Sequence, residues 1–162
     1  DSADTIVPYI FGEIRKVRHS SDFIKIETSN IGNMQLKLFP VTKDSSIVCV
    51  IKTVCGGVDT KLCDSDISFY TTEWKKLDSD TFLDEVSAEI FFDSSQKGSE
   101  NYKYALSLPD IYPISAEFNE NNDDLLLIFN YKERISDIQI AGITPFLKSD
   151  SITLKWEDSS FR

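Results

Sequence analysis

The sequence predicts a mainly β domain, an antiparallel β-sandwich or barrel-like fold of about ten short strands with one short helix near residues 81–91. Most segments alternate apolar and polar residues with a period of two, which is typical of strands with one buried face. Clusters of Asn, Gly, Asp and Ser separate these segments and indicate turns. The 162 residues match the size of one domain, so we expect a single β-rich domain over residues 1–162.

The clearest prediction is a hairpin early in the chain. Ile24 and Ile26 alternate with charged residues, and Met34 and Leu36 alternate with polar residues further on. Residues 30–33 between them read Asn-Ile-Gly-Asn, and Asn and Gly tolerate the positive φ angles of tight turns.

Two largely apolar runs predict central strands. Residues 47–51 read Ile-Val-Cys-Val-Ile, which suits a strand that is covered on both faces. Residues 125–131 form the second run, and turn residues at 119–124 separate it from an alternating strand at 114–118. Alternation at residues 67–72 adds another strand.

Alternating apolar residues also predict strands at 102–108, 138–140 and 152–157. The segment after Pro8 has helical as well as alternating spacing, but Gly12 and several β-branched residues favour a strand there.

One segment has helical spacing and is predicted to be an amphipathic helix over residues 81–91. Phe82, Val86 and Ile90 fall on one helical face. Ser79 and Asp80 can cap its start, and the acidic residues that follow suit the positive end of the helix dipole.

The charge distribution limits the partners. The formal net charge is −10, and residues 41–162 hold 22 acidic residues against 12 basic ones. A field of this sign repels phosphate backbones, so we expect no nucleic-acid partner and a protein partner with a basic surface. The one basic cluster, at residues 15–19, is expected to be a solvated face. No apolar run approaches the roughly 20 residues of a membrane helix, so no membrane insertion is expected.

The three cysteines bear on the cellular compartment. Cys49 lies in an apolar run and is expected in the core. Cys55 and Cys63 flank residues 56–62, a loop that a disulfide could close, and this pairing stays open. The absence of an Asn-x-Ser/Thr sequon favours an intracellular (cytoplasmic or nuclear) protein, with a secreted protein as the alternative. Residues 1–4 lack signal-peptide features and the chain does not begin with Met, so we expect a processed or trimmed piece.

No pattern in the sequence points to catalysis. His19 is the only histidine, which removes most metal sites and most general-base schemes. The sequence has no nucleophile elbow, P-loop, dinucleotide-binding glycine motif or C-x-x-C motif, so we expect no enzyme, cofactor or metal site. Acidic runs at 64–66, 78–80 and 119–124 could offer oxygen atoms to Ca²⁺. They lack the spacing of a calcium loop, and we expect ordinary turns, with calcium binding left open.

Aromatic residues are the remaining candidates for a binding site. Trp74 and Trp156 lie toward the ends of predicted strands, and tryptophan is a common anchor at protein interfaces, although core filling is the alternative role. By elimination, we expect a non-catalytic protein–protein interaction module that binds its partner through an edge strand or an aromatic surface. The alternative is a secreted or surface-exposed β-sandwich that binds carbohydrate or a host or cell-surface protein, possibly with one disulfide. The sequence does not predict the oligomeric state.

Overall fold

The computed structural model describes residues 6–10, 12–109 and 111–162, so residues 1–4 lie outside the described chain. The described strands are antiparallel and form one sheet of six strands, one of three and a short hairpin. The first sheet is a meander of β1 (Ile6–Tyr9), β2 (Gly12–His19), β3 (Phe23–Glu27), β4 (Gly32–Thr42), β5 (Ser45–Gly56) and β6 (Leu62–Thr71). The second contains β7 (Ile114–Phe118), β8 (Leu125–Phe129) and β9 (Ser151–Leu154), and the hairpin joins β10 (Trp156–Glu157) to β11 (Ser160–Phe161). The prediction of a mainly β, antiparallel domain is confirmed.

The strongest strand predictions match the observed register. Ile24 in β3 lies opposite Leu36 in β4, so the early hairpin is confirmed. Residues 47–51 lie in β5, between β4 and β6, and all five are buried. The turn at 119–124 connects β7 to β8, as predicted.

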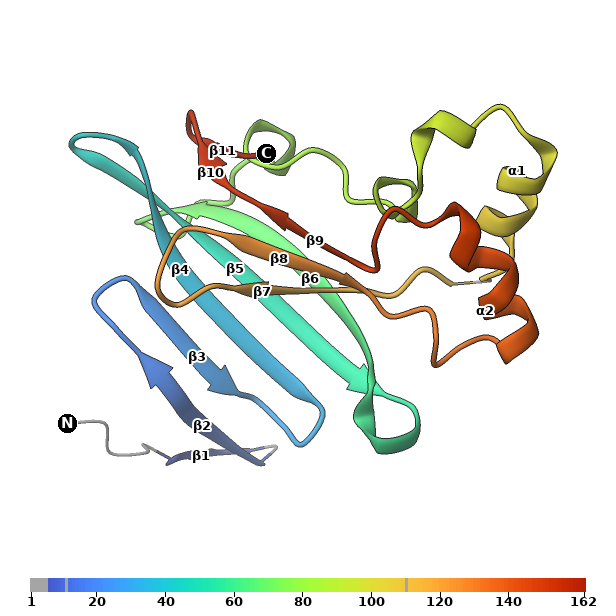
Figure 1. The fold of residues 1–162 in the computed structure, drawn as a ribbon. Coiled ribbons are helices and arrows are strands. Elements are labelled where there is room, and N and C mark those ends of the chain that lie inside the picture. The colour runs from blue at the N-terminus through green and yellow to red at the C-terminus, as the bar shows by residue number, and fades with distance from the viewer. Residues whose placement is uncertain (1–5, 11, 110) are drawn as a thin grey trace.

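The second sheet lies over one face of the first, which gives a sandwich-like arrangement (Figure 1). We call the face of the first sheet that meets β7–β9 the inner face, and the opposite one the outer face. The aromatic rings of Phe23 and Phe39 on the inner face lie 6.5 and 5.5 Å, centroid to centroid, from the ring of Phe118 in β7. Such aromatic pairs supply much of the buried apolar area of a core.

A lysine ammonium group holds the turn at residues 119–124. The side chain of Lys37 is only 2% exposed, and its Nζ donates to the carbonyl oxygens of Asn119 at 3.2 Å and Asn122 at 2.6 Å. The carboxylates of Asp22 and Asp123 lie 3.7 and 3.4 Å from the same nitrogen. In the acidic run at 119–124, oxygen atoms that could bind Ca²⁺ therefore surround the ammonium group of Lys37.

Two α-helices replace two of the predicted strands. The helix α1 (Glu100–Ser107) replaces the strand predicted at 102–108, because the Ser99 hydroxyl caps it by accepting from the N–H of Tyr102. The helix α2 (Asp137–Ile143) replaces the strand predicted at 138–140 and begins with a capping box between Ser136 and Gln139. Both lie at one end of the second sheet (Figure 1). No described helix is long and apolar enough to span a membrane.

The α-helix predicted at 81–91 is wrong. This stretch contains only short 3₁₀ turns, at Ser79–Thr81 and Ala88–Phe91. The carbonyl oxygens of Phe82 and Phe91 instead accept hydrogen bonds from the N–H groups of Phe161 (2.7 Å) and Lys148 (2.8 Å). Apart from the local bonds of its 3₁₀ turns, the segment therefore bonds to the C-terminal part of the chain. Further 3₁₀ turns occur at Val58–Thr60, Ser94–Gln96 and Thr144–Phe146.

Candidate functional site

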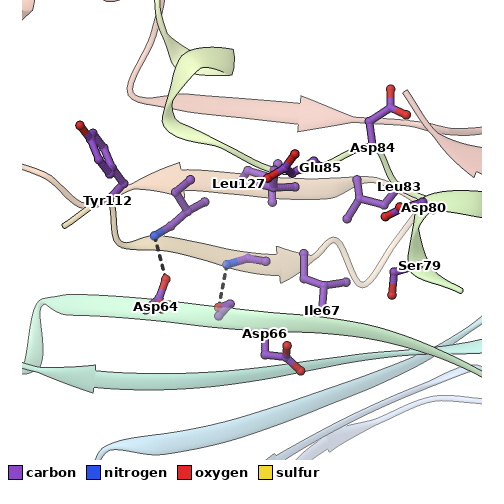
Figure 2. A pocket seen from close by; sticks show the side chains of 14 residues that line it. Asp64, Asp66, Ile67, Ser79, Asp80, Leu83, Asp84, Glu85, Tyr112 and Leu127 are labelled. Carbon is purple, nitrogen blue, oxygen red and sulfur yellow. Dashed lines mark hydrogen bonds between the residues drawn. The ribbon is translucent and has the colours of Figure 1, made fainter. Parts of the chain in front are cut away.

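A cleft of about 250 Å³ lies between β6, β7 and the segment that follows residue 78 (Figure 2). Apolar side chains line it in part, namely those of Ile67, Leu83, Val86, Ile114, Ala116 and Leu127. Its other lining residues include five that carry carboxylates, namely Asp64, Asp66, Asp80, Asp84 and Glu85. We call this site the acidic cleft.

The carboxylates of the acidic cleft form no salt bridge with a described residue, although Lys52 lies directly opposite Asp66 in the sheet. None of the described residues that line it is Lys, Arg or His. None of the five carboxylates lies within salt-bridge distance of a described basic side chain, whereas Glu117 and Glu120 nearby pair with Lys25 and Arg18. A recess lined by charge of one sign focuses the electrostatic field, so the cleft attracts cations and repels anions.

The open edge of β6 runs through this cleft. In an antiparallel strand, the N–H and C=O groups of successive residues point alternately to the two sides. The carbonyl oxygens of Cys63 and Phe69 accept hydrogen bonds from groups outside the first sheet, the Asn130 amide and the Leu77 N–H. The backbone groups of Ser65 and Ile67, at the positions between them, therefore also point away from β5. Among the described residues they have no hydrogen-bond partner, so two N–H and two C=O groups are unpaired, at an edge that β7 contacts through the side chains of Asp64 and Ser65.

Side chains of β6 fix one wall of the cleft. Asp64 Oδ1 accepts a hydrogen bond from the N–H of Ile114 at 3.0 Å, and Ser65 Oγ accepts one from the N–H of Ala116 at 2.9 Å (Figure 2). Ser65 Oγ also lies 2.8 Å from the hydroxyl of Thr53 in β5. The acidic run at 64–66 is therefore part of a strand, and the turn predicted there is wrong.

Trp74 lies outside this cleft and on the surface. Its side chain is 60% exposed, and its backbone adopts the left-handed conformation, with φ of 63°. The turn that carries it is closed by hydrogen bonds from the N–H of Trp74 to the carbonyl oxygen of Thr71 and from the N–H of Thr71 to that of Lys75. The ring of Tyr70 lies 5.9 Å from the Trp74 ring.

Trp156 is half-buried and packs against the core. Its ring lies 4.7 Å from the ring of Phe39 and 4.9 Å from that of Phe161. Its indole Nε1 donates to the carbonyl oxygen of Pro40 at 2.9 Å. The structure thus places the two tryptophans in different settings, and it places neither in the acidic cleft.

The cysteines are arranged for stability rather than reactivity. Cys49 is fully buried, as predicted, and burial raises the pKa of its thiol well above the usual value. Cys55 in β5 and Cys63 in β6 form a disulfide between directly opposed residues. His19 is exposed on β2. No described cysteine is therefore an accessible thiol.

No three His, Cys, Asp or Glu side chains among the described residues are grouped so that they could hold a metal ion. The five acidic residues of the cleft are instead exposed to solvent. Two acidic runs of the cleft were visible in the sequence, but their proximity in space was not. Residues 64–66 and 79–86 are brought together only by the path of the chain after β6. A strand with an acidic edge is the signal that could have indicated the site.

Comparisons with known proteins supply a family and a fold. The curated proteins contain no match to this chain. A solved structure, described as a domain of an uncharacterized protein from Porphyromonas gingivalis W83, is similar with a TM-score of 0.80 and 25% sequence identity. The similarity covers 98% of this chain and 79% of that one. The family described as "Protein of unknown function (DUF3256)" matches residues 10–161, and the chain belongs to this family.

Proposed function

We propose that this protein is a non-catalytic interaction module whose acidic cleft receives an extended, basic segment of a partner protein along β6. The observation that carries the proposal is the position of the unpaired backbone groups of Ser65 and Ile67 beside a cleft whose carboxylates form no salt bridge with a described residue. Neither feature alone would be specific. An open strand edge accepts any extended backbone, and the surrounding carboxylates select for positive charge.

The expected mode of binding is the addition of a strand. The N–H and C=O groups of the partner segment would pair with those of Ser65 and Ile67, and this pairing supplies affinity without reading sequence. Alternate side chains of the segment would point to opposite faces of the sheet. Lys or Arg side chains of the partner segment would then approach the carboxylates of Asp66 on β6 and of Asp80 and Glu85 across the cleft. These charges would act mainly on the association rate.

A peptide selection tests the charge requirement. A phage-displayed library of random short peptides is selected on the wild-type protein and on a variant with Asp84→Lys and Glu85→Lys. The control variant carries Asp44→Lys and Glu133→Lys, which make the same change in net charge at exposed positions outside the cleft. Peptides that the cleft variant loses and the control retains are expected to be rich in Lys and Arg. Their affinity for the cleft variant should fall about tenfold or more, with a strong dependence on salt.

Amide hydrogen exchange tests the edge itself. A selected basic peptide should slow the exchange of the Ser65 and Ile67 N–H groups. The N–H of Asp66 serves as the internal control, because it points toward β5 and is protected already. If charge-dependent binding leaves the exchange of Ser65 and Ile67 unchanged, then the cleft binds cations without adding a strand, and the proposed mode is wrong.

The disulfide favours the second candidate, a secreted or surface-exposed binding domain. Disulfides persist in oxidising compartments and are rare in the cytosol. We therefore place the proposed module in an oxidising compartment, in preference to the intracellular location that the sequence favoured. Mass spectrometry of non-reduced peptides from natively produced protein tests this placement. Reduced Cys55 and Cys63 in that protein would return the preference to the cytosol.

A further inference from the structure

The two ends of the acidic cleft differ in chemistry. At one end, Tyr112 lines the cleft just before β7 begins, where side-chain hydrogen bonds hold β7 beside the first half of β6. At the other end, the N–H of Leu77 donates to the carbonyl oxygen of Phe69, which brings the segment after residue 78 against the second half of β6. Figure 2 shows Tyr112 at one end of the cleft and Asp80 and Asp84 at the other.

The Tyr112 end offers an aromatic surface that is held in one orientation. The hydroxyl of Tyr112 donates to the carbonyl oxygen of Leu106, and its ring stacks on that of Phe129 with 6.3 Å between the centroids. Tyr112 is nevertheless 38% exposed, and the adjacent Ile111 is 55% exposed. Because the hydroxyl is already bonded within the protein, this end offers a partner mainly apolar contact. Rigid tyrosines of this kind are common anchors at protein interfaces.

The available negative charge is concentrated at the opposite end. Asp80, Asp84 and Glu85 are exposed there and form no salt bridge with a described residue. The carboxylate of Asp64, at the Tyr112 end, already accepts a hydrogen bond from a backbone N–H of β7. A cation is therefore attracted mainly to the end of the cleft away from Tyr112.

Apolar side chains connect the two ends. Ile67 on β6 and Val86 across the cleft are both half-buried and line it. Ile67 belongs to the inner face, because the register connects it through Ile51 to Gln35, whose side chain bonds to β7. A segment added along β6 points every second side chain toward this face. Those side chains would meet the carboxylates, the apolar wall and Tyr112 in turn.

We infer that the acidic cleft, if it receives a strand as proposed above, selects a segment in which Lys or Arg precedes a large apolar side chain on the same face. The order follows from the direction of β6, which runs from the Tyr112 end toward the Asp80 end. The strand pairs of the described sheets are antiparallel, and we take the added segment to be antiparallel as well. Its basic residues then enter beside Asp80, and its apolar residue reaches Tyr112. Residues 64 and 67 of β6 mark the two ends and are about 10 Å apart, so the two kinds of side chain belong roughly two to four positions apart.

Matched synthetic peptides test the order. The first is the capped peptide Thr-Lys-Thr-Lys-Thr-Phe-Thr, in which threonine favours an extended backbone. The second, Thr-Phe-Thr-Lys-Thr-Lys-Thr, reverses the order and keeps the composition and charge. The third replaces the phenylalanine of the first with serine. Dissociation constants from NMR titration of the isotope-labelled protein should show that the first peptide binds about tenfold more tightly than the other two.

Substitutions at Tyr112 test the anchor. Tyr112→Ala removes the ring, and Tyr112→Phe retains the ring without its hydroxyl. The matched control is Tyr104→Ala, because Tyr104 is an exposed tyrosine on α1 that does not line the cleft. Tyr112→Ala should bind the first peptide about tenfold more weakly and the third as the wild type does. Tyr112→Phe and Tyr104→Ala should bind all three as the wild type does, whereas the cleft variant with Asp84→Lys and Glu85→Lys should lose affinity for the first.

Three results would overturn the inference and leave the proposed function intact. The first is that the two phenylalanine peptides bind the wild type equally, or the reversed one binds more tightly, while both depend on Asp84 and Glu85. This comparison needs no substitution at Tyr112, so it decides the order even if Tyr112→Ala does not fold. The second is that Tyr112→Ala, folded by urea denaturation, binds the first peptide as the wild type does. The third is that none of the three peptides binds although basic peptides from the library do. If neither these peptides nor the library yields binding that depends on Asp84 and Glu85, then the proposed function itself fails, and the inference fails with it.

Discussion

The carboxylate of Asp64 in β6 accepts a hydrogen bond, at 3.0 Å, from the backbone N–H of Ile114 in β7, a residue 50 positions further along the chain. The same arrangement recurs along β7, where the N–H of Ala116 donates to Ser65 and that of Phe118 donates to the side chain of Gln35. Side chains of the first sheet therefore accept hydrogen bonds from three backbone N–H groups on the open edge of β7. The two sheets are joined at this edge without a continuous backbone ladder.

This relationship predicts different effects of two substitutions at residue 64. Asp64→Ala leaves the partly buried N–H of Ile114 without its acceptor, and we expect a loss of about 1 kcal/mol in the free energy of unfolding. Asp64→Asn keeps an oxygen acceptor and should retain most of that stability. Urea denaturation measures both. Equal losses in the two variants would show that the charge, rather than the hydrogen bond, is what matters.

The buried ammonium group of Lys37 should contribute more to the free energy of unfolding than the more exposed ion pair of Lys25 on the neighbouring strand β3. Lys37→Met removes the donor to the carbonyl oxygens of Asn119 and Asn122, and we expect a loss of about 2–3 kcal/mol, since bonds to charged groups are the stronger class. The matched control is Lys25→Met. It removes the pair with Glu117, which is half exposed, and should cost about 1 kcal/mol or less. Comparable losses in chemical denaturation would contradict the role of Lys37 in holding the turn.

Removal of the disulfide should destabilise the domain without changing the fold. Cys55 and Cys63 are separated by 8 positions, and closure of a loop this short lowers the entropy of the unfolded chain. The double variant Cys55→Ser and Cys63→Ser should lose about 2–3 kcal/mol by thermal or urea unfolding. A reducing agent should have the same effect on the wild type and none on the double variant. If the reducing agent also destabilised the double variant, its effect would not come from the Cys55–Cys63 disulfide.

The stability of the segment after η3 (Ala88–Phe91) should fall in acid. Asp93 accepts hydrogen bonds from the side chain and the N–H of Ser95 and from the side chain of Gln96, and these bonds lower its pKa below the usual 3.8. Because the folded pKa lies below the unfolded value, the stabilisation is present above about pH 4 and is lost as the pH falls through the folded pKa. Asp93→Asn should therefore remove part of the loss of stability that the wild type shows between about pH 5 and about pH 2. Urea midpoints at several pH values measure this difference, and parallel pH profiles would refute it.

The first half of the chain was predictable because its signals are local. The alternation of residues 24–38 fixes which side chains share a face, so the β3–β4 hairpin follows from the sequence. Its turn lies at residues 28–31, two positions earlier than predicted, because Gly32 and Asn33 already belong to β4. The apolar run at 47–51 identified the central strand for the same reason. The capping box at Ser136 and Gln139 was a local signal too, and a search for it would have found α2.

The acidic cleft was decided by the tertiary structure. Phe82, Val86 and Ile90 have helical spacing, yet their segment bonds to residues near Lys148 and Phe161, and these contacts outweigh the weak local preference of a short helix. That extended path places acidic side chains opposite β6. Composition and local pattern are enough to predict a negatively charged, mainly β domain with a buried Cys49 and turn-rich connections. They do not predict which strand edge stays open, which tryptophan reaches solvent or which lysine is buried, because each of these depends on contacts between residues far apart in the chain.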